Sequence, residues 1–237
     1  MLKCIHDEMI LMIKIVNKEF NDNNIPFVLL GGSVLGSIRH NGFIPWDDDM
    51  DIGVFRKDYK KAEELLSNIQ SYTYEKSDSH IIPDGPIGHL RLLNDDTMQK
   101  GLIPTIDVFA LDAVPENRIL RIIQKISANI YHLCVYRRPA TNRGFVAKIV
   151  TKGIIICIPG FVLDYIQKCA FRMFTQFNNR KSKYTGNLFG YWKDKEVFDT
   201  TMYTKTTTGT FEGIELPLPK NPHEYLVQLY GDYMTLP

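Results

Sequence analysis

Small and acidic residues suited to phosphate chemistry gather between positions 30 and 55, which read LGGSVLGSIRHNGFIPWDDDMDIGVF. A short apolar run ends in Gly31 and Gly32, where the lack of a Cβ lets the backbone approach a ligand closely. Ser33 follows with the properties of a helix N-cap, and a helix N-terminus offers free N–H groups and a partial positive charge. The pattern predicts that Gly31, Gly32 and Ser33 form a phosphate-binding turn.

Four aspartates lie a few positions further on, at 47, 48, 49 and 51. Residues two apart on a strand share a face, so Asp49 and Asp51 are expected to point the same way. Adjacent carboxylates repel each other unless a divalent cation lies between them. We therefore predict that Asp49 and Asp51 bind Mg²⁺ or Mn²⁺ beside the phosphate turn. Asp47 is expected to complete or support the metal sphere, and Asp48 to point away from the pair.

A third carboxylate is expected from a neighbouring strand, as a metal ligand or as the base for an attacking hydroxyl. Asp107 is the candidate, because it lies inside the apolar run TIDVFAL at 105–111, where an acid is costly unless paired. Asp112 is the alternative, although its place before Ala113, Val114 and Pro115 is typical of a turn. Asp49, Asp51 and Asp107 are thus the predicted catalytic and metal-binding set.

Basic and aromatic residues near these acids allow more than one interpretation. Arg39 follows the phosphate turn and is either a bidentate diphosphate ligand or a surface arginine. Arg91, in the predicted strand 87–93, either contacts phosphate or lies exposed at an edge. For Trp46, Tyr191 and Trp192, packing is favoured over stacking on a base, a cationic group or an acceptor.

Several familiar site types are excluded by spacing. The chain has no G-x-x-x-x-G-K-[ST], G-x-S-x-G or H-E-x-x-H motif, and the acidic run lacks the glycine and glutamate of a calcium-binding EF-hand loop. The four cysteines have no zinc-ligand spacing and are expected to be reduced thiols. What remains is a phosphate site beside a pair of acids.

Periodicity predicts the elements that must position these residues. Helices are expected over 2–22, 33–38, 58–69, 117–136 and 145–178, the last broken at Pro159 and Gly160. Strands are expected over 27–30, 50–55, 71–74, 87–93 and 105–111, followed by a loop-rich tail with a short helix at 223–229. We expect an α/β (α+β) catalytic core over 1–116, a basic helical insertion over 117–183, and a C-terminal segment, 184–237, that folds back on the core.

Charge is distributed unevenly over the 237 residues, although the net charge is only +1. Residues 118–183 hold thirteen Lys and Arg and one acid, Asp164, a net charge of +12. This charge is equally consistent with two alternatives. The segment either contacts an anionic partner, such as a membrane surface, or presents a basic face that is only solvated. The longest apolar run, 153–163, is too short to span a bilayer and no signal peptide is recognised. A cytoplasmic protein, peripheral at the inner membrane face through 118–183, is expected.

The chain resembles the LicD family, whose relatives include the fukutin proteins, in three stretches: GGSVLGSIRHNGFIPWDDDMDIG at 31–53, IDVFALDAVP at 106–115 and FEGIELPLPKNPHEYLVQLYGDYMTLP at 211–237. The resemblance implies a nucleotidyltransferase-type mixed sheet. It also implies that Asp49 and Asp51 are the metal pair, Asp107 the third acid, and Gly31, Gly32 and Ser33 the nucleotide-phosphate loop. The C-terminal motif Tyr230-Gly231-Asp232-Tyr233 is expected to line the donor site.

Members of that family transfer a phosphorylated alcohol from a CDP-linked donor to a glycan hydroxyl. The resemblance therefore implies CDP-choline, or CDP-glycerol or CDP-ribitol, as donor, a glycan or lipid-linked glycan as acceptor, and CMP as product. Two alternatives stay open: a nucleotidyltransferase that moves NMP from an NTP to a small molecule, and a non-enzymatic protein that binds an anionic polymer. The complete set of acids argues against the second, and nucleic acid is not expected as a partner.

Overall fold

The computed structural model describes residues 2–76, 85–93, 101, 103–137, 144–179 and 181–235. The helices are α1 (Leu2–Asp22), α2 (Gly31–His40), α3 (Arg56–Ser67), α5 (Arg118–Tyr136), α6 (Gly144–Cys157), α7 (Gly160–Thr175), α8 (Thr201–Thr204) and α9 (Pro222–Tyr230), with 3₁₀ turns η1 (Gln176–Asn179) and η2 (Lys193–Glu196). The strands are β1 (Phe27–Leu29), β2 (Asp49–Phe55), β3 (Thr73–Lys76), β4 (Ile87–Arg91), β5 (Thr105–Val114), β6 (Tyr184–Asn187), β7 (Val197–Asp199), β8 (Thr207–Phe211) and β9 (Ile214–Leu218).

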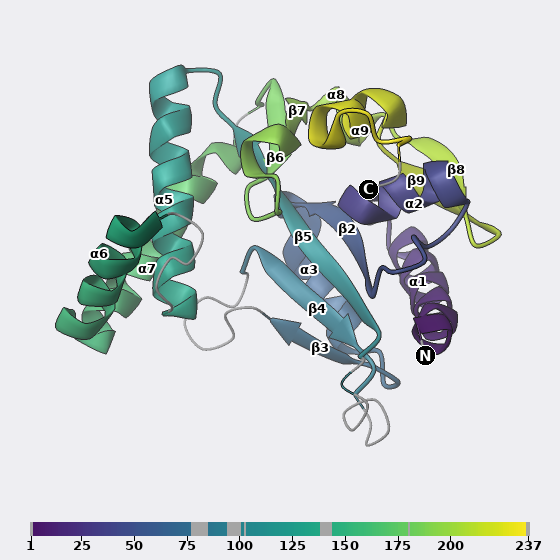
Figure 1. Ribbon diagram of the computed structural model, residues 1–237, viewed down its shortest axis with the longest axis horizontal. Helices are drawn as coiled ribbons and strands as arrows, with labels where there is room; N and C mark the ends of the chain where they lie inside the picture. The colour runs from purple at the N-terminus through teal and green to yellow at the C-terminus, as the bar shows by residue number, and fades with distance from the viewer. Residues whose placement is uncertain are drawn as a thin grey trace.

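A mixed sheet forms the centre of the molecule, with strands in the order β1-β2-β5-β4-β3 (Figure 1). β2 and β5 are parallel, and the other pairs along this path are antiparallel. β6 pairs with the end of β5 and then with β7, which extends the sheet. The expected α/β architecture with a mixed sheet is confirmed.

Helices pack against one face of this sheet. The alternation of side chains along each strand determines which residues face these helices. Met50, Ile52 and Val54 on β2 are fully buried, while Asp49 and Asp51, which alternate with them, are only partly buried. α1 and α3 pack against the sheet, and Tyr59 of α3 donates a hydrogen bond to a backbone oxygen of β5. Because residues two apart share a face, the acids lie on the opposite, more open side.

The C-terminal region contains more regular structure than the sequence predicts. Four strands, β6 to β9, occupy a tail that was expected to be largely loop, and this expectation is wrong. β8 reads TTGTF, in which only Phe211 is buried and the three threonines are exposed, so it lacks the apolar alternation that signals a half-buried strand. The predicted short helix is confirmed as α9, which contacts α2, while β9 contacts β1.

The three long helices α5, α6 and α7 lie to one side of the sheet (Figure 1). α5 packs along α7, with Ala128, Tyr131, Ala170 and Phe174 forming a small second core. The expected break at Pro159 and Gly160 is confirmed, since α6 ends at Cys157 and α7 begins at Gly160. Among the described residues, no helix is both long and apolar enough to cross a bilayer.

Candidate active site

The glycine turn joins β1 to α2, and its geometry differs from the prediction in one respect. α2 begins at Gly31, with Leu30 in the capping position, so the expectation that Ser33 is the N-cap is wrong. Gly31 has a φ of +47°, a left-handed conformation that glycine adopts without strain and that starts the helix two residues early. Ser33 is instead buried, and its hydroxyl oxygen accepts a hydrogen bond of 2.8 Å from the backbone N–H of Asp51.

The two glycines lie directly against the acidic residues. A Cβ added at Gly31 would be 2.9 Å from Oδ2 of Asp51, and one added at Gly32 would be 2.8 Å from Oδ2 of Asp47. Any larger residue at either position would displace a carboxylate. The turn and the acids therefore form one continuous surface, as the sequence predicts.

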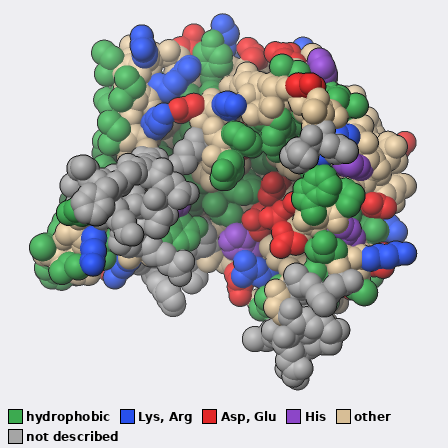
Figure 2. All heavy atoms as spheres, in the orientation of Figure 1, with side chains coloured by type: hydrophobic (Ala, Val, Ile, Leu, Met, Phe, Trp, Pro, Cys, Tyr) green, Lys and Arg blue, Asp and Glu red, His purple; other side chains and the backbone are tan. Residues whose placement is uncertain are grey.

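Three carboxylates meet on the open face of the sheet. Asp51 and Asp107 are register partners in the parallel pair of β2 and β5, and Asp49 lies two residues before Asp51 on the same face. One oxygen from each of the three lies within 4.8 Å of the others. Figure 2 shows acidic side chains gathered beside a hollow on this face of the molecule. The structure thus brings together all three predicted acids.

The carboxylates of this cluster are partly buried and carry like charges, and both conditions raise the pKa values of Asp49 and Asp51. Burial, with Asp107 as the next cause, raises the pKa of Asp49 from 3.8 to about 6. Burial, followed by Asp49 and Asp107, raises the pKa of Asp51 well above its usual value. Oxygen ligands of this kind suit hard divalent cations, and a cation between them would offset the repulsion. The residues present therefore fit Mg²⁺ or Mn²⁺.

Asp47 and Asp48 lie beside this cluster. Oxygens of Asp47, Asp48 and Asp49 also lie within 4.8 Å of one another, so the expectation that Asp48 points away from Asp49 is wrong. The strand alternation behind that expectation does not hold here, because β2 begins only at Asp49. Burial and the neighbouring Asp49 raise the pKa of Asp47 to about 6.

His89 belongs to the site and was missed by sequence reasoning. It is the register partner of Asp107 across β4 and β5, and its Nδ1 lies 2.6 Å from Oδ1 of Asp107. In the tautomer that carries its proton on Nδ1, His89 donates this hydrogen bond to the carboxylate. The sequence did contain a pattern that could have indicated His89. Alternation along the strand IGHLR places His89 on the same face as Arg91, which was predicted to be a site residue.

The two predicted phosphate-binding arginines make protein contacts. Arg39 donates from its Nη1 to the backbone oxygen of Tyr233, at 3.0 Å, and so holds the C-terminal segment. Arg91 pairs with Glu75 on β3, and its buried Nε has no hydrogen-bond partner among the described residues. Arg91 therefore retains a donor on the face that carries His89 and the acids, and both phosphate roles stay predictions.

Asp112, the alternative third carboxylate, has a structural role. It lies fully buried inside β5, with Arg56 donating to both its oxygens at 2.8 Å. Asn178 donates to it as well, at 2.7 Å. The interpretation of Asp112 as a turn residue is wrong, because β5 continues to Val114 where β6 pairs with it.

Aromatic residues around the site are more exposed than predicted. Trp46 is 57% exposed and Tyr191 is 84% exposed, so the expectation that both side chains pack is wrong. Trp192 does pack, with its ring edge-on to Tyr230 at 5.4 Å. Tyr230 in turn reaches the glycine turn, since its hydroxyl would lie 3.8 Å from a Cβ at Gly31.

Tyr225 is a second contact of the turn from α9, and no sequence signal singled it out. Its buried hydroxyl accepts a hydrogen bond of 2.9 Å from the backbone N–H of Gly31. The C-terminal helix thus fixes the start of α2.

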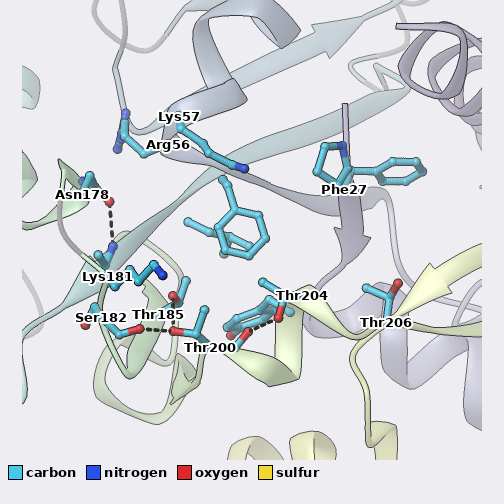
Figure 3. Close-up of a pocket in the computed structure, with 15 residues that line it drawn as sticks. Phe27, Arg56, Lys57, Asn178, Lys181, Ser182, Thr185, Thr200, Thr204 and Thr206 are labelled. Atoms are coloured by element: carbon cyan, nitrogen blue, oxygen red, sulfur yellow. Dashed lines mark hydrogen bonds between the residues drawn. The ribbon is translucent and has the colours of Figure 1, made fainter. Parts of the chain in front are cut away.

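A cavity of about 580 Å³ lies elsewhere, toward the opposite end of β2 (Figure 3). Phe55, Arg56, Lys57 and Lys181 line it together with several threonines, and none of the predicted site residues does. The acids and the glycine turn are therefore separate from this cavity.

Comparison with known proteins places the site in a family. Residues 24–92 match the family model described as LicD/FKTN/FKRP, nucleotidyltransferase domain. This stretch holds the glycine turn, Asp49, Asp51 and His89. Over this stretch the chain belongs to the LicD/FKTN/FKRP family.

Three relatives show how much of the chain and of their own length the similarity covers. The lipopolysaccharide cholinephosphotransferase LicD of Haemophilus influenzae is 27% identical over 90% of the chain and 83% of its own length. The human ribitol 5-phosphate transferase FKRP is 44% identical over 17% of the chain and 8% of its own length. The mouse ribitol-5-phosphate transferase FKTN is 39% identical over 21% and 11%.

Proposed function

We propose that this LicD-family phosphotransferase moves a phosphorylated alcohol from a CDP-linked donor to a hydroxyl of a cell-surface glycan and releases CMP. The observation that carries the proposal is the meeting of Asp49, Asp51 and Asp107 beside the glycine turn. A turn that binds phosphate next to carboxylates that bind a divalent cation is the arrangement that phosphoryl transfer requires.

Phosphocholine is the group that we propose is transferred. The relative named as a cholinephosphotransferase aligns over 90% of the chain, whereas the human ribitol 5-phosphate transferase aligns over 17%. The exposed ring of Trp46, adjacent in sequence to Asp47, supports this choice, because aromatic faces attract quaternary ammonium groups. Glycerol or ribitol phosphate is the alternative cargo.

Each residue of the site has a role in this proposal. Gly32 and Ser33 hold the donor diphosphate, and Asp49, Asp51 and Asp107 hold the cation. A bound Mg²⁺ or Mn²⁺ would neutralise charge on the diphosphate. The acceptor hydroxyl attacks the phosphorus that carries the alcohol, its proton passes to Asp107, and the bond from this phosphorus to CMP breaks.

His89 acts through Asp107 and is a positioning residue in this scheme. Its Nδ1 hydrogen bond occupies Oδ1 of Asp107 and fixes the rotation of the carboxylate, which leaves Oδ2 free to face the reacting atoms. Partners of this kind orient metal ligands in many proteins.

Donor turnover tests the proposal directly. The purified chain with Mg²⁺ is incubated separately with CDP-choline, CDP-glycerol, CDP-ribitol and the four NTPs, while CMP and pyrophosphate are measured. We expect CMP from CDP-choline, falling about 100-fold or more in Asp49→Asn/Asp51→Asn. The matched control is Asp22→Asn, an acid 60% exposed on α1, which should retain full turnover.

Other products would contradict the proposal. Pyrophosphate from an NTP would make the chain a nucleotidyltransferase of the ordinary kind. CMP release that survives in Asp49→Asn/Asp51→Asn would separate the activity from the acid cluster.

A further inference from the structure

Helix α6 is apolar but is not packed into the core. It ends in the run GIIIC, and the residues whose burial the structure describes, 149 and 151–157, include none that is fully buried. Ile149 is 54% exposed and Ile156 is 70% exposed. Apolar side chains left exposed on a helix are typical of a surface that contacts a partner.

Helix α5 carries an unpartnered apolar stripe at the same end of the molecule. Five isoleucines recur every three or four residues and so share one side of the helix: Ile119, Ile122, Ile123, Ile126 and Ile130. All are exposed, Ile119 by 68%. The side that packs toward α7 is a different one, with Gln124, Ala128 and Tyr131 buried on it. Figure 2 shows hydrophobic side chains along the outer edge of this helical region, with basic side chains next to them.

Charge identifies the partner. Residues 118–183 carry a net charge of +12, and their single acid, Asp164, is paired with Arg137. Exposed cations that remain include Arg118 on α5, Lys152 on α6, and Lys168 and Arg172 on α7. A second copy of the chain would bring two such basic surfaces together, whereas anionic lipid complements both the charge and the isoleucines.

We propose that α5 and α6 form a docking surface for an anionic lipid bilayer. The isoleucines of α5 and the exposed face of α6 enter the interface between headgroups and acyl chains, while the cations contact lipid phosphates. Since none of the described helices is both long and apolar enough to span a bilayer, the proposed contact is interfacial. The inference rests on this surface alone and is independent of the proposed transferase activity.

Flotation of the full chain with lipid vesicles tests the proposal. The vesicles are either phosphatidylglycerol mixed with phosphatidylcholine or phosphatidylcholine alone. We expect the chain to float with the mixed vesicles and to remain unbound with phosphatidylcholine alone. The stripe variant Ile119→Ser/Ile122→Ser/Ile126→Ser should bind at least about tenfold more weakly.

Two further variants separate apolar and electrostatic contributions. The matched control Leu11→Ser/Val227→Ser/Met234→Ser removes three exposed apolar side chains outside α5 to α7 and should float like the unaltered chain. The charge variant Lys152→Glu/Lys168→Glu/Arg172→Glu should lose about fivefold in affinity for each charge removed and bind with less dependence on salt. Thermal unfolding shows that each variant is folded.

Any of three results would overturn the proposal. These are that the unaltered chain does not float with the mixed vesicles, that it floats equally well with phosphatidylcholine alone, or that the stripe variant floats as well as the control. Light scattering provides an independent check. A dimer that becomes a monomer in the stripe variant, without vesicle binding, would instead assign the surface to self-association.

Discussion

The environment of Asp51 indicates that the acidic site lowers the stability of the folded protein when no cation is bound. Its carboxylate is held against Asp49 and Asp107, and burial raises its pKa well above the usual value. Without a cation, charged carboxylates in this position repel one another and lose hydration. A site built to bind a cation is therefore strained when the cation is absent.

This strain predicts an unusual pH dependence for the metal-free protein. The pKa of Asp49 is raised from 3.8 to about 6, so between these values the folded state binds a proton that the unfolded state lacks. The contribution of this group to the free energy of unfolding therefore falls as pH rises through that window. Asp47 and Asp51 shift in the same direction.

The measurement is thermal unfolding of the chain and of Asp49→Asn/Asp51→Asn across this pH range in EDTA. We expect the unaltered chain and the variant to have similar Tm values at about pH 4. Near neutral pH the Tm of the variant should be several degrees higher, since each kcal/mol shifts Tm by about 2–4 °C in a chain of this size. Saturating Mg²⁺ should stabilise only the unaltered chain. A variant less stable than the unaltered chain in EDTA at neutral pH would contradict the argument.

His89 makes the second prediction at this scale. His89→Ala frees Oδ1 of Asp107, so we expect Mg²⁺ affinity and kcat to fall about 10–100-fold. His89→Asn keeps an amide donor near the position of Nδ1 and should recover most of the loss. Mg²⁺ titration by calorimetry, together with kcat and KM for the donor measured separately, distinguishes this role from donor binding. An asparagine variant as impaired as the alanine variant would show that the hydrogen bond is not the cause.

Asp112 links three elements, because β5 carries it while its partners Arg56 and Asn178 belong to α3 and η1. Arg56→Met leaves a buried charge without its main partner and should cost about 3–5 kcal/mol of unfolding free energy. Arg56→Met/Asp112→Leu removes both charges and should recover most of that loss. Urea unfolding provides the values. If Asp112→Asn unfolded normally but abolished donor turnover, Asp112 would be the third catalytic acid after all.

The elements around the glycine turn follow from local chemistry, which explains why they could be predicted. The order of strand, glycine turn, helix and acidic strand needs only the apolar run at 27–29, the glycines and the alternation around Asp49 and Asp51. Asp107 was recognisable because an acid inside an apolar strand is costly without a partner.

Residues whose roles depend on long-range pairing could not be found this way. His89 joins the site because β4 aligns with β5 in one register, and Tyr225 because α9 packs on α2. Neither neighbour can be read from local sequence. Trp46 was expected to pack, yet its side chain is exposed and adjacent in sequence to Asp47; such departures from local expectation are common at functional sites.

At the scale of the whole molecule, two strands that pair with each other, β5 and β6, are separated in the sequence by the helices α5, α6 and α7. Val114 near the end of β5 pairs with Tyr184 at the start of β6, so the chain leaves the sheet and returns to the same place. η1 belongs with the sheet, since Asn178 contacts Asp112 and Ala113. We therefore propose that the helices are a separable unit inserted into a catalytic core.

Replacement of residues 118–175 by a Gly/Ser linker tests this organisation and keeps η1 in place. We expect a folded chain with a lower Tm, because Phe189 loses its ring contacts with Tyr131 and Phe174. Stabilisation by Mg²⁺ should remain, since Asp49, Asp51, Asp107 and the glycine turn all lie outside the replaced segment. Vesicle binding should disappear. Thermal unfolding with and without Mg²⁺ supplies the measurement, and loss of the Mg²⁺ response in a folded chain would make the helices part of the catalytic unit.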